Sequence, residues 1–176
     1  DNTFDAINSR ALTAFLASAM ASGAKVPDID LAIRAVARMA AAMEAKAKRT
    51  HYANDAETII RDGLDAVGVK VPDKAWDGAM AAYYDAVSGV VTACGETTGA
   101  VLRQLFEQGR QLGLVSNTLW RPEMHDADLE RFGLLEYLPV RVYSSTSGFI
   151  KPDGRIYRAA LDRFDVAPAE AVFVGD

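Results

Sequence analysis

The run "LGLVSN" at Leu112–Asn117 decides the fold. It is a short apolar run that ends in polar residues, as a buried strand of a parallel sheet does. The runs "LPVRVYS" at 138–144 and "AVFVGD" at 171–176 repeat this pattern, and helical segments separate the three. Strand, helix, strand, helix and strand in succession predict an α/β fold with a parallel sheet covered on both faces.

Helical periodicity marks the segments around these strands. One helix precedes the first strand and ends near Gly109, a second covers roughly 123–131 and closes at Gly133, and a third lies in "DGRIYRAALDRF" at 153–164. Their apolar positions are Val101, Leu102, Leu105 and Phe106 in the first, and Ile156, Ala160 and Leu161 in the third. The spacing of three and four residues is that of one helix face.

The first half of the chain contains only helical patterns. Four amphipathic helices with short connections predict a helical bundle. Their apolar stripes are Leu12, Phe15, Leu16, Ala19 and Met20; Ile33, Val36, Ala37, Ala40 and Met43; Ile60, Leu64 and Val67; and Trp76, Met80, Tyr83 and Val87.

Composition excludes several classes of partner. The 176 residues are 50% hydrophobic and 24% charged, with a net charge of −5, so the chain offers no basic field for nucleic acid. The apolar stretch at 35–43 is broken by Arg38 and is too short to span a bilayer. We see no secretory signal at the start, and the single cysteine, Cys94, excludes an internal disulfide. We therefore expect a cytoplasmic protein without a membrane partner.

Polar residues follow each predicted strand. Ser116, Asn117 and Thr118 follow the first, Ser144, Ser145 and then Lys151 follow the second, and Gly175 and Asp176 follow the third. In an open parallel sheet, ligands bind at the carboxyl ends of the strands. Taken singly, these residues also fit a helix cap, a solvated turn or a chain end. Their joint occurrence favours a site.

The motifs resemble those of a known family. "LVSN", "KPDGRIYRAAL" and "VFVGD" are similar to the second, third and fourth motifs of the haloacid dehalogenase superfamily, and the resemblance covers most of residues 95–176. Ser116 and Lys151 are 35 residues apart, and Lys151 and Asp176 are 25 apart, which fits the family. "DNT" at 1–3 matches the last three positions of its first motif, Asp-x-Asp-x-Thr.

The register of that first motif determines the role of Asp1. If Asp1 were the nucleophile, a Thr would be expected four residues later, where the chain has Asp5. The resemblance therefore places the nucleophile two residues before Asp1. It implies a doubly wound, Rossmann-like core formed by residues 1–4 and 94–176, with an inserted four-helix cap at 5–93. The chain is expected to be truncated at both ends: the first strand precedes residue 1, and a further acid follows Asp176.

The resemblance implies a Mg²⁺-dependent phosphohydrolase that acts on a small phosphorylated metabolite through an aspartyl-phosphate. Asp1, Ser116 and Lys151 are the implied catalytic residues, with Asp1 as general acid and base. Thr3, Ser116, Asn117 and Lys151 would bind the phosphate. Asp1 and Asp176 would hold Mg²⁺, which prefers carboxylate oxygens.

Other functions within the same fold stay open. A haloacid dehalogenase is one, although such enzymes typically lack an acid at the position of Asp1. A phosphomutase and a catalytically inactive binding protein are the others. His51, His125 and Cys94 show no metal-ligand spacing and are assigned no chemistry. No motif indicates the substrate or the oligomeric state.

Overall fold

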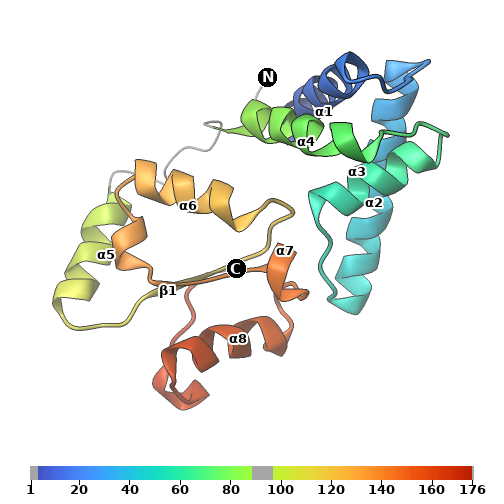
Figure 1. The fold of residues 1–176 in the computed structure, drawn as a ribbon. Helices are drawn as coiled ribbons and strands as arrows, with labels where there is room; N and C mark the ends of the chain where they lie inside the picture. Colours follow the sequence, from blue (N-terminus) through green and yellow to red (C-terminus); the bar gives the residue numbers. More distant parts are fainter. Residues whose placement is uncertain (1–3, 89–96, 176) are drawn as a thin grey trace. The chain divides into compact units, whose positions relative to one another are not determined.

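A computed structural model describes residues 4–88 and 97–175 of the chain (Figure 1). The chain divides into two compact units. The first comprises Asp1–Ala45 and Ala56–Thr92, and the second comprises Lys46–Asp55 and Ala93–Asp176. The predicted residues Asp1, Thr3, Cys94 and Asp176 lie outside the described part of the chain.

The first unit contains the four helices predicted from the sequence. They are α1 (Phe4–Ala21), α2 (Ile29–Thr50), α3 (Ala56–Asp65) and α4 (Asp73–Val87), and the last turn of α2 belongs to the second unit. The described helices are too short or too polar to cross a membrane.

Helices α1 and α4 pack along each other through the predicted apolar stripes. The Phe15 and Trp76 rings meet edge to face with centroids 5.2 Å apart, and Phe15 is completely buried. Tyr83 is buried as well, and its hydroxyl donates to Asn8 Oδ1 at 3.1 Å. Met20, assigned to the α1 stripe by its spacing, is instead 41% exposed. The stripe is therefore narrower at the end of α1 than the spacing predicts.

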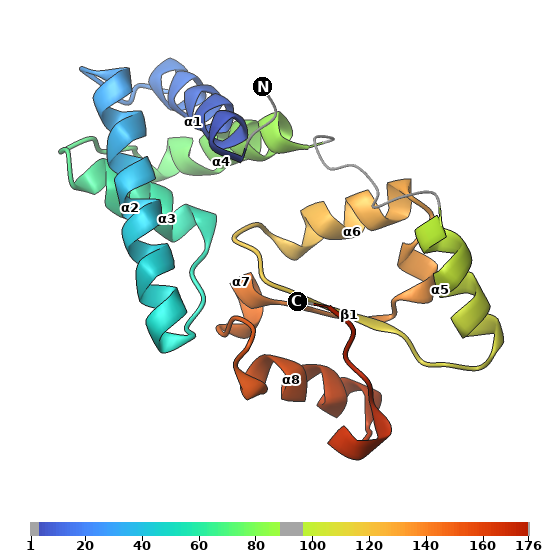
Figure 2. The same cartoon turned by 180° about the vertical axis from the view of Figure 1, so that it is seen from behind.

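The second unit alternates helices with two short strands. Its elements are α5 (Thr97–Glu107), β1 (Gly113–Ser116), α6 (Pro122–Arg131), η1 (Leu135–Tyr137), β2 (Val140–Tyr143), α7 (Ser144–Ser147), α8 (Gly154–Phe164) and η2 (Pro168–Glu170). Strands β1 and β2 are parallel, with Gly113 opposite Val140 and Ser116 opposite Tyr143. Helices α6 and α8 lie on opposite faces of this sheet (Figures 1 and 2). The predicted parallel α/β arrangement is therefore present, in a small sheet.

The sheet packs closely against α8. Ile156 is completely buried and Ala160 nearly so, and both pack with Val142 of β2. Gly113 is required at the start of β1, because an added Cβ would lie 2.7 Å from Phe164 Cζ and 2.7 Å from the Val140 carbonyl oxygen. The apolar face predicted for α8 is thus the face that covers the sheet.

Residues 171–175, the described part of the third strand predicted at 171–176, do not form a strand. Residues 171–175 have no regular structure, and Val172 and Val174 are 90% and 89% exposed. A strand exists only where a neighbouring strand accepts its backbone hydrogen bonds, and in the described chain β1 pairs with β2 alone. The apolar sequence at 171–174 is typical of a strand, but no neighbouring strand pairs with it in the described chain.

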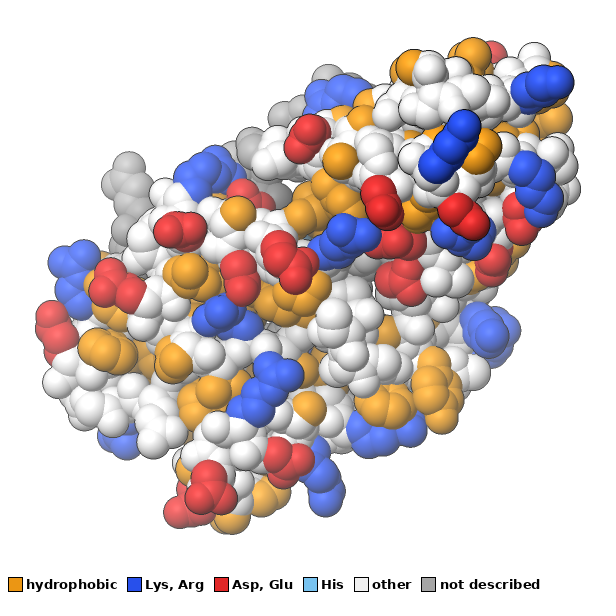
Figure 3. Space-filling view, in the orientation of Figure 1, with side chains coloured by type: hydrophobic (Ala, Val, Ile, Leu, Met, Phe, Trp, Pro, Cys, Tyr) orange, Lys and Arg blue, Asp and Glu red, His pale blue; other side chains and the backbone are white. Residues whose placement is uncertain are grey.

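The molecular surface is mixed in character. On the face shown in Figure 3, acidic and basic side chains are interspersed with apolar ones. Some apolar side chains of α5 contribute to the exposed surface, with Val101 and Phe106 about half exposed. Helix α5 therefore has no fully buried residue, although its pattern is amphipathic.

Candidate active site

The carboxyl ends of β1 and β2 lie side by side, because Ser116 and Tyr143 are register partners. The two chain segments that leave these ends are joined by hydrogen bonds from side chains to backbone. The side chains that make these bonds are Asn117, Ser144 and Ser145. The edge of the sheet at which the sequence predicted a site therefore consists of two segments, residues 116–120 and 144–151, which these hydrogen bonds hold together. We call this edge the rim.

Ser144 provides the most buried of these tethers. Its side chain is 1% exposed. The Ser144 hydroxyl accepts from the Thr118 N–H at 2.8 Å and donates to the Thr118 carbonyl at 2.9 Å. Next to it, the Ser145 hydroxyl donates to the Trp120 carbonyl at 2.7 Å. The backbone at 118–120 is thereby fixed to the start of α7.

Asn117 holds the backbone of Lys151. Its Oδ1 accepts from the Lys151 N–H at 2.7 Å, and its Nδ2 donates to the Lys151 carbonyl at 3.3 Å. Within the described part of the chain, the neighbouring Ser116 hydroxyl makes one contact, with the Asn117 carbonyl at 3.5 Å, which is at the limit for a hydrogen bond. A hydroxyl that can turn toward a ligand and a lysine are thus brought to the same edge of the sheet.

The segment before Lys151 pairs with the segment that follows α2. Tyr52 and Phe149 form an isolated antiparallel bridge. Ala53 N–H donates to the Gly148 carbonyl and Ile150 N–H to the His51 carbonyl, both at 2.9 Å. Residues 148–150 are therefore fixed by backbone hydrogen bonds immediately before Lys151.

The segment after Lys151 is held by an ion pair. Asp153 caps α8 by accepting from the Arg155 N–H at 2.9 Å, and it also binds the Arg155 guanidinium at 2.8 Å. These hydrogen bonds lower the pKa of the Asp153 carboxyl well below its usual range. The guanidinium carbon lies 3.8 Å from the centroid of the Phe149 ring. Lys151 thus lies between two anchored segments.

The ammonium group of Lys151 faces an aromatic ring. Its Nζ lies 5.4 Å from the centroid of Phe173, within the range of a cation–π contact. Phe173 in turn meets the Tyr157 ring edge to face at 4.9 Å. Residues 171–175 therefore contribute an aromatic neighbour to Lys151 although they form no strand.

Behind the rim lies a stack of aromatic side chains. His125 is stacked between Trp120 and Tyr143, with centroid distances of 5.9 and 5.1 Å, and its Nε2 lies 2.7 Å from Thr118 Oγ1. Burial lowers the pKa of His125 more than the nearby Asp128 and Asp126 carboxylates raise it. The His125 ring therefore packs between the Trp120 and Tyr143 rings.

An ion pair extends this stack. Arg141 Nε and Nη2 bind the two carboxylate oxygens of Asp126 at 2.8 and 3.1 Å, and the Tyr143 hydroxyl donates to Asp126 at 2.7 Å. Burial tends to raise the pKa of Asp126, but these hydrogen bonds outweigh it and lower the pKa. Burial, and then the bond to Asp126, raise the pKa of Tyr143.

The structure brings together three of the predicted site residues, Ser116, Asn117 and Lys151. A hydroxyl donor and an ammonium group that extend from residues at one edge of a sheet suit an anionic ligand such as a phosphoryl group. Among residues 4–88 and 97–175, no group of three or more His, Cys, Asp or Glu side chains could hold a metal ion.

The tethering roles of Ser144 and Ser145 were not predicted. The sequence placed both residues at the end of a strand, and this position is the only signal that pointed to them. Their partners lie 26 and 25 residues away in the chain, and no local pattern encodes such a pairing.

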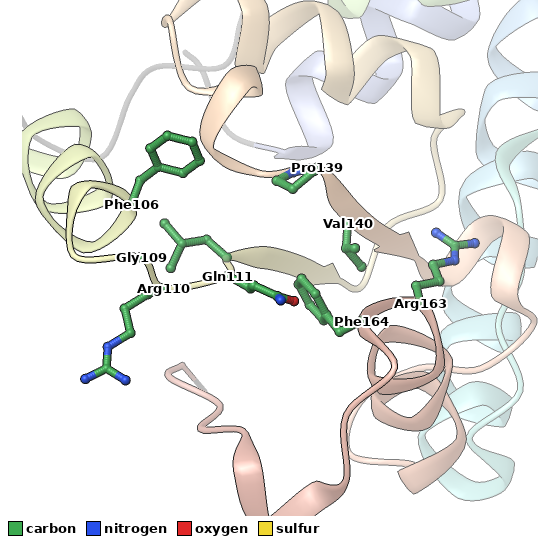
Figure 4. A pocket seen from close by; sticks show the side chains of 9 residues that line it. Phe106, Gly109, Arg110, Gln111, Pro139, Val140, Arg163 and Phe164 are labelled. Carbon is green, nitrogen blue, oxygen red and sulfur yellow. The ribbon is translucent and has the colours of Figure 1, made fainter.

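A separate cavity of about 440 Å³ lies at the other end of the strands (Figure 4). Phe106 and Phe164 lie on its two sides, and Pro139 and Val140 complete an apolar wall. It is lined by residues that precede or begin β1 and β2 and by Arg163 and Phe164 at the end of α8. The described site residues Ser116, Asn117 and Lys151 do not line it.

Comparisons with known proteins agree on one family for this chain. The family model for haloacid dehalogenase-like hydrolases matches residues 4–176. The chain is 31% identical over 120 residues to a phosphoserine phosphatase of Thermus thermophilus, covering 68% of this chain and 46% of that protein. It is 33% identical over 100 residues to a ribulose-1,5-bisphosphate 5-phosphatase of Halopiger xanaduensis, covering 57% of this chain and 39% of that protein. The chain thus spans less than half the length of these curated relatives.

Proposed function

Because the chain belongs to the haloacid dehalogenase-like hydrolases, we propose that it carries part of the active site of a phosphohydrolase for a small phosphate ester. The observation that carries this proposal is the hold of Asn117 on Lys151 beside Ser116. The names of both relatives, a phosphoserine phosphatase and a ribulose-1,5-bisphosphate 5-phosphatase, favour phosphoryl transfer over dehalogenation. The substrate is then a small phosphorylated metabolite.

The rim residues bind and polarise the phosphoryl group. The Ser116 hydroxyl donates to a phosphoryl oxygen, and the Lys151 ammonium neutralises charge on the phosphoryl group and on the nucleophile. Thr3 belongs to the same phosphate-binding set by its position in the first motif. Asn117 contributes to that set by holding Lys151 in place.

The proton transfers are assigned to Asp1. The nucleophilic aspartate, placed by the family resemblance two residues before Asp1, attacks phosphorus and forms an aspartyl-phosphate. Asp1 protonates the leaving oxygen and then removes a proton from the water that hydrolyses the intermediate. Because the displacement is divided into two steps, the same group first donates a proton to the leaving oxygen and then accepts a proton from water.

We assign Mg²⁺ to Asp1 and Asp176. Carboxylates are hard oxygen ligands of the kind that Mg²⁺ prefers, and the hydroxyl and ammonium of the described rim are suited to the phosphate instead. When bound, Mg²⁺ supplies stabilisation of negative charge on the phosphoryl oxygens. The helices at 5–93 act as the cap that excludes water and selects the substrate, residues 1–4 and 94–176 form the core, and the protein works in the cytoplasm.

The test is phosphate release by the full-length protein from an aryl phosphate, from phosphoserine and from a sugar bisphosphate, with Mg²⁺ and with a chelator. A 2-haloacid is the parallel substrate. We expect phosphate release that stops with the chelator and returns when Mg²⁺ is added. Halide release without metal, together with no phosphate release, would show a dehalogenase, and phosphate transfer between substrate carbons would show a mutase.

A further inference from the structure

We propose that Asn117 is a positioning residue for Lys151: its carboxamide fixes the Lys151 backbone, and so directs the ammonium group toward a bound phosphoryl group. The proposal rests on the phosphohydrolase function proposed above. It differs from a direct contact between Asn117 and the phosphate, because Asn117 then acts only through Lys151. The two roles predict different behaviour when Lys151 is absent.

The geometry of the contact matches the amide side chain of Asn117. The carboxamide turns its oxygen to the Lys151 N–H, at 2.7 Å, and its nitrogen to the carbonyl of the same residue, at 3.3 Å. Only an amide side chain carries an acceptor and an uncharged donor side by side. An aspartate at this position would keep the first bond and lose the second. The two bonds together define both the position and the orientation of one peptide segment.

The position of this backbone matters because lysine is a long and flexible side chain. Its ammonium group can reach a fixed point only if the Cα from which it extends is fixed as well. The bonds from residues 51–53 hold the chain before Lys151, and the Asp153 cap holds the chain after it. Asn117 bonds the backbone of Lys151 itself. A misplacement of about 1 Å in an active site can cost on the order of a hundredfold in rate.

A tether that merely stabilises the fold would behave differently, and Ser145 offers the matched comparison. Its hydroxyl joins the same two loops through one hydrogen bond to a backbone carbonyl, that of Trp120. Loss of that bond weakens the connection between the loops without releasing Lys151. A comparison of variants at Asn117 and Ser145 therefore distinguishes the positioning of Lys151 from a general connection between the two loops.

The experiment is a double-mutant cycle on the full-length protein, with an aryl phosphate and Mg²⁺. We expect Asn117→Ala to lower kcat about 10- to 100-fold and Ser145→Ala to leave it within about twofold. In the Lys151→Ala background, Asn117→Ala should have no further effect, because the group it positions is gone. An equal loss in both backgrounds would overturn the proposal and indicate a direct contact with substrate. Should Asn117→Ala fail to fold, Asn117→Asp serves in the same cycle.

Hydrogen exchange of the Lys151 amide gives a readout that requires no turnover. In Asn117→Ala this amide should exchange at least about tenfold faster than in the wild type, and in Ser145→Ala it should not. Unchanged exchange in Asn117→Ala would overturn the proposal even if the enzyme is active. If the wild type releases no phosphate with Mg²⁺, the proposed function itself fails, and the exchange rates show separately whether Asn117 holds Lys151.

Discussion

The Ser144 hydroxyl bonds both backbone groups of Thr118, accepting from its N–H at 2.8 Å and donating to its carbonyl at 2.9 Å. The Ser144 side chain thus bonds the N–H and the C=O of one residue, as the backbone of a neighbouring strand would. The pair joins the ends of β1 and β2 beyond the last register partners.

Replacement of Ser144 by alanine should therefore be costly. It leaves two backbone groups of Thr118 without their partner next to a side chain that is 1% exposed. Each buried polar group left unsatisfied costs about 1–3 kcal/mol, so we expect Ser144→Ala to lower the free energy of unfolding by about 2–4 kcal/mol. Urea denaturation measures this. Ser145→Ala, which removes one bond, should cost about 0.5–1.5 kcal/mol, and a larger loss in Ser145→Ala than in Ser144→Ala would contradict the assignment.

The charged rim residue should dominate catalysis. We expect Lys151→Ala to lower kcat for phosphate release about 100-fold or more, because one lost interaction with developing charge typically costs that much. The melting temperature should change little, since Asn117 binds the Lys151 backbone and the alanine variant keeps that bond. Lys74→Ala, at an exposed position of α4, is the control. Similar activities for the two variants would remove Lys151 from the site.

Stability should fall in mild acid because of His125. Burial lowers its pKa in the folded state below the unperturbed value of about 6.5, so the unfolded chain binds more protons. The contribution of the neutral histidine is complete above the unfolded pKa and is lost as the pH falls below about 6.5. Urea unfolding at pH 7.5 and pH 5.5 should show this loss in the wild type. In His125→Phe, which keeps a stacked ring and removes the titration, it should be smaller; the same loss in both proteins would rule out His125 as its cause.

Two helical glycines should respond in opposite directions to alanine. An added Cβ at Gly63 of α3 would lie 2.6 Å from Val36 Cα, whereas at Gly78 of α4 nothing lies within 4 Å. Gly78→Ala should stabilise the protein by about 0.5–1 kcal/mol through helix propensity. Gly63→Ala gains the same propensity but is overpacked, at a cost of about 1–3 kcal/mol, so it should be net destabilising. Thermal unfolding of both variants decides this, and stabilisation by Gly63→Ala would show that α2 and α3 move apart easily.

The sequence predicted those parts of the fold that depend on local patterns. The four helices of the first unit, both strands and α8 were expected from periodicity, and Phe15, Trp76 and Ile156 are buried as their stripes indicated. The strand at 171–176 was wrong because a strand depends on a neighbour, which "AVFV" cannot encode. The burial of Met20 was wrong because a stripe does not show where its packing partner ends.

The sequence predicted that three candidate residues lie at one edge of the sheet, and it did not predict the hydrogen bonds between them. Ser116, Asn117 and Lys151 were expected at one rim because parallel strands end at the same edge. That Asn117 bonds the backbone of Lys151, 34 residues away, depends on the path of the loop at 144–151. No spacing rule relates an amide to a peptide group so far along the chain. The roles predicted from the sequence for the site residues stay predictions, for Ser116, Asn117 and Lys151 as for Asp1, Thr3 and Asp176.

The two hydrogen bonds that Asn117 makes to residue 151 do not depend on the side chain at position 151. Asn117 bonds an N–H and a carbonyl, and every amino acid except proline has both. The contact therefore requires a particular side chain at position 117. The residue at position 151 can be replaced by any residue except proline, and both hydrogen bonds remain. A library randomised at 151 should yield mostly folded proteins that keep both bonds, and one randomised at 117 should mostly lose the two bonds to the backbone of residue 151. Such a scaffold could be given a different reactive group at 151 and would still present it at the same place.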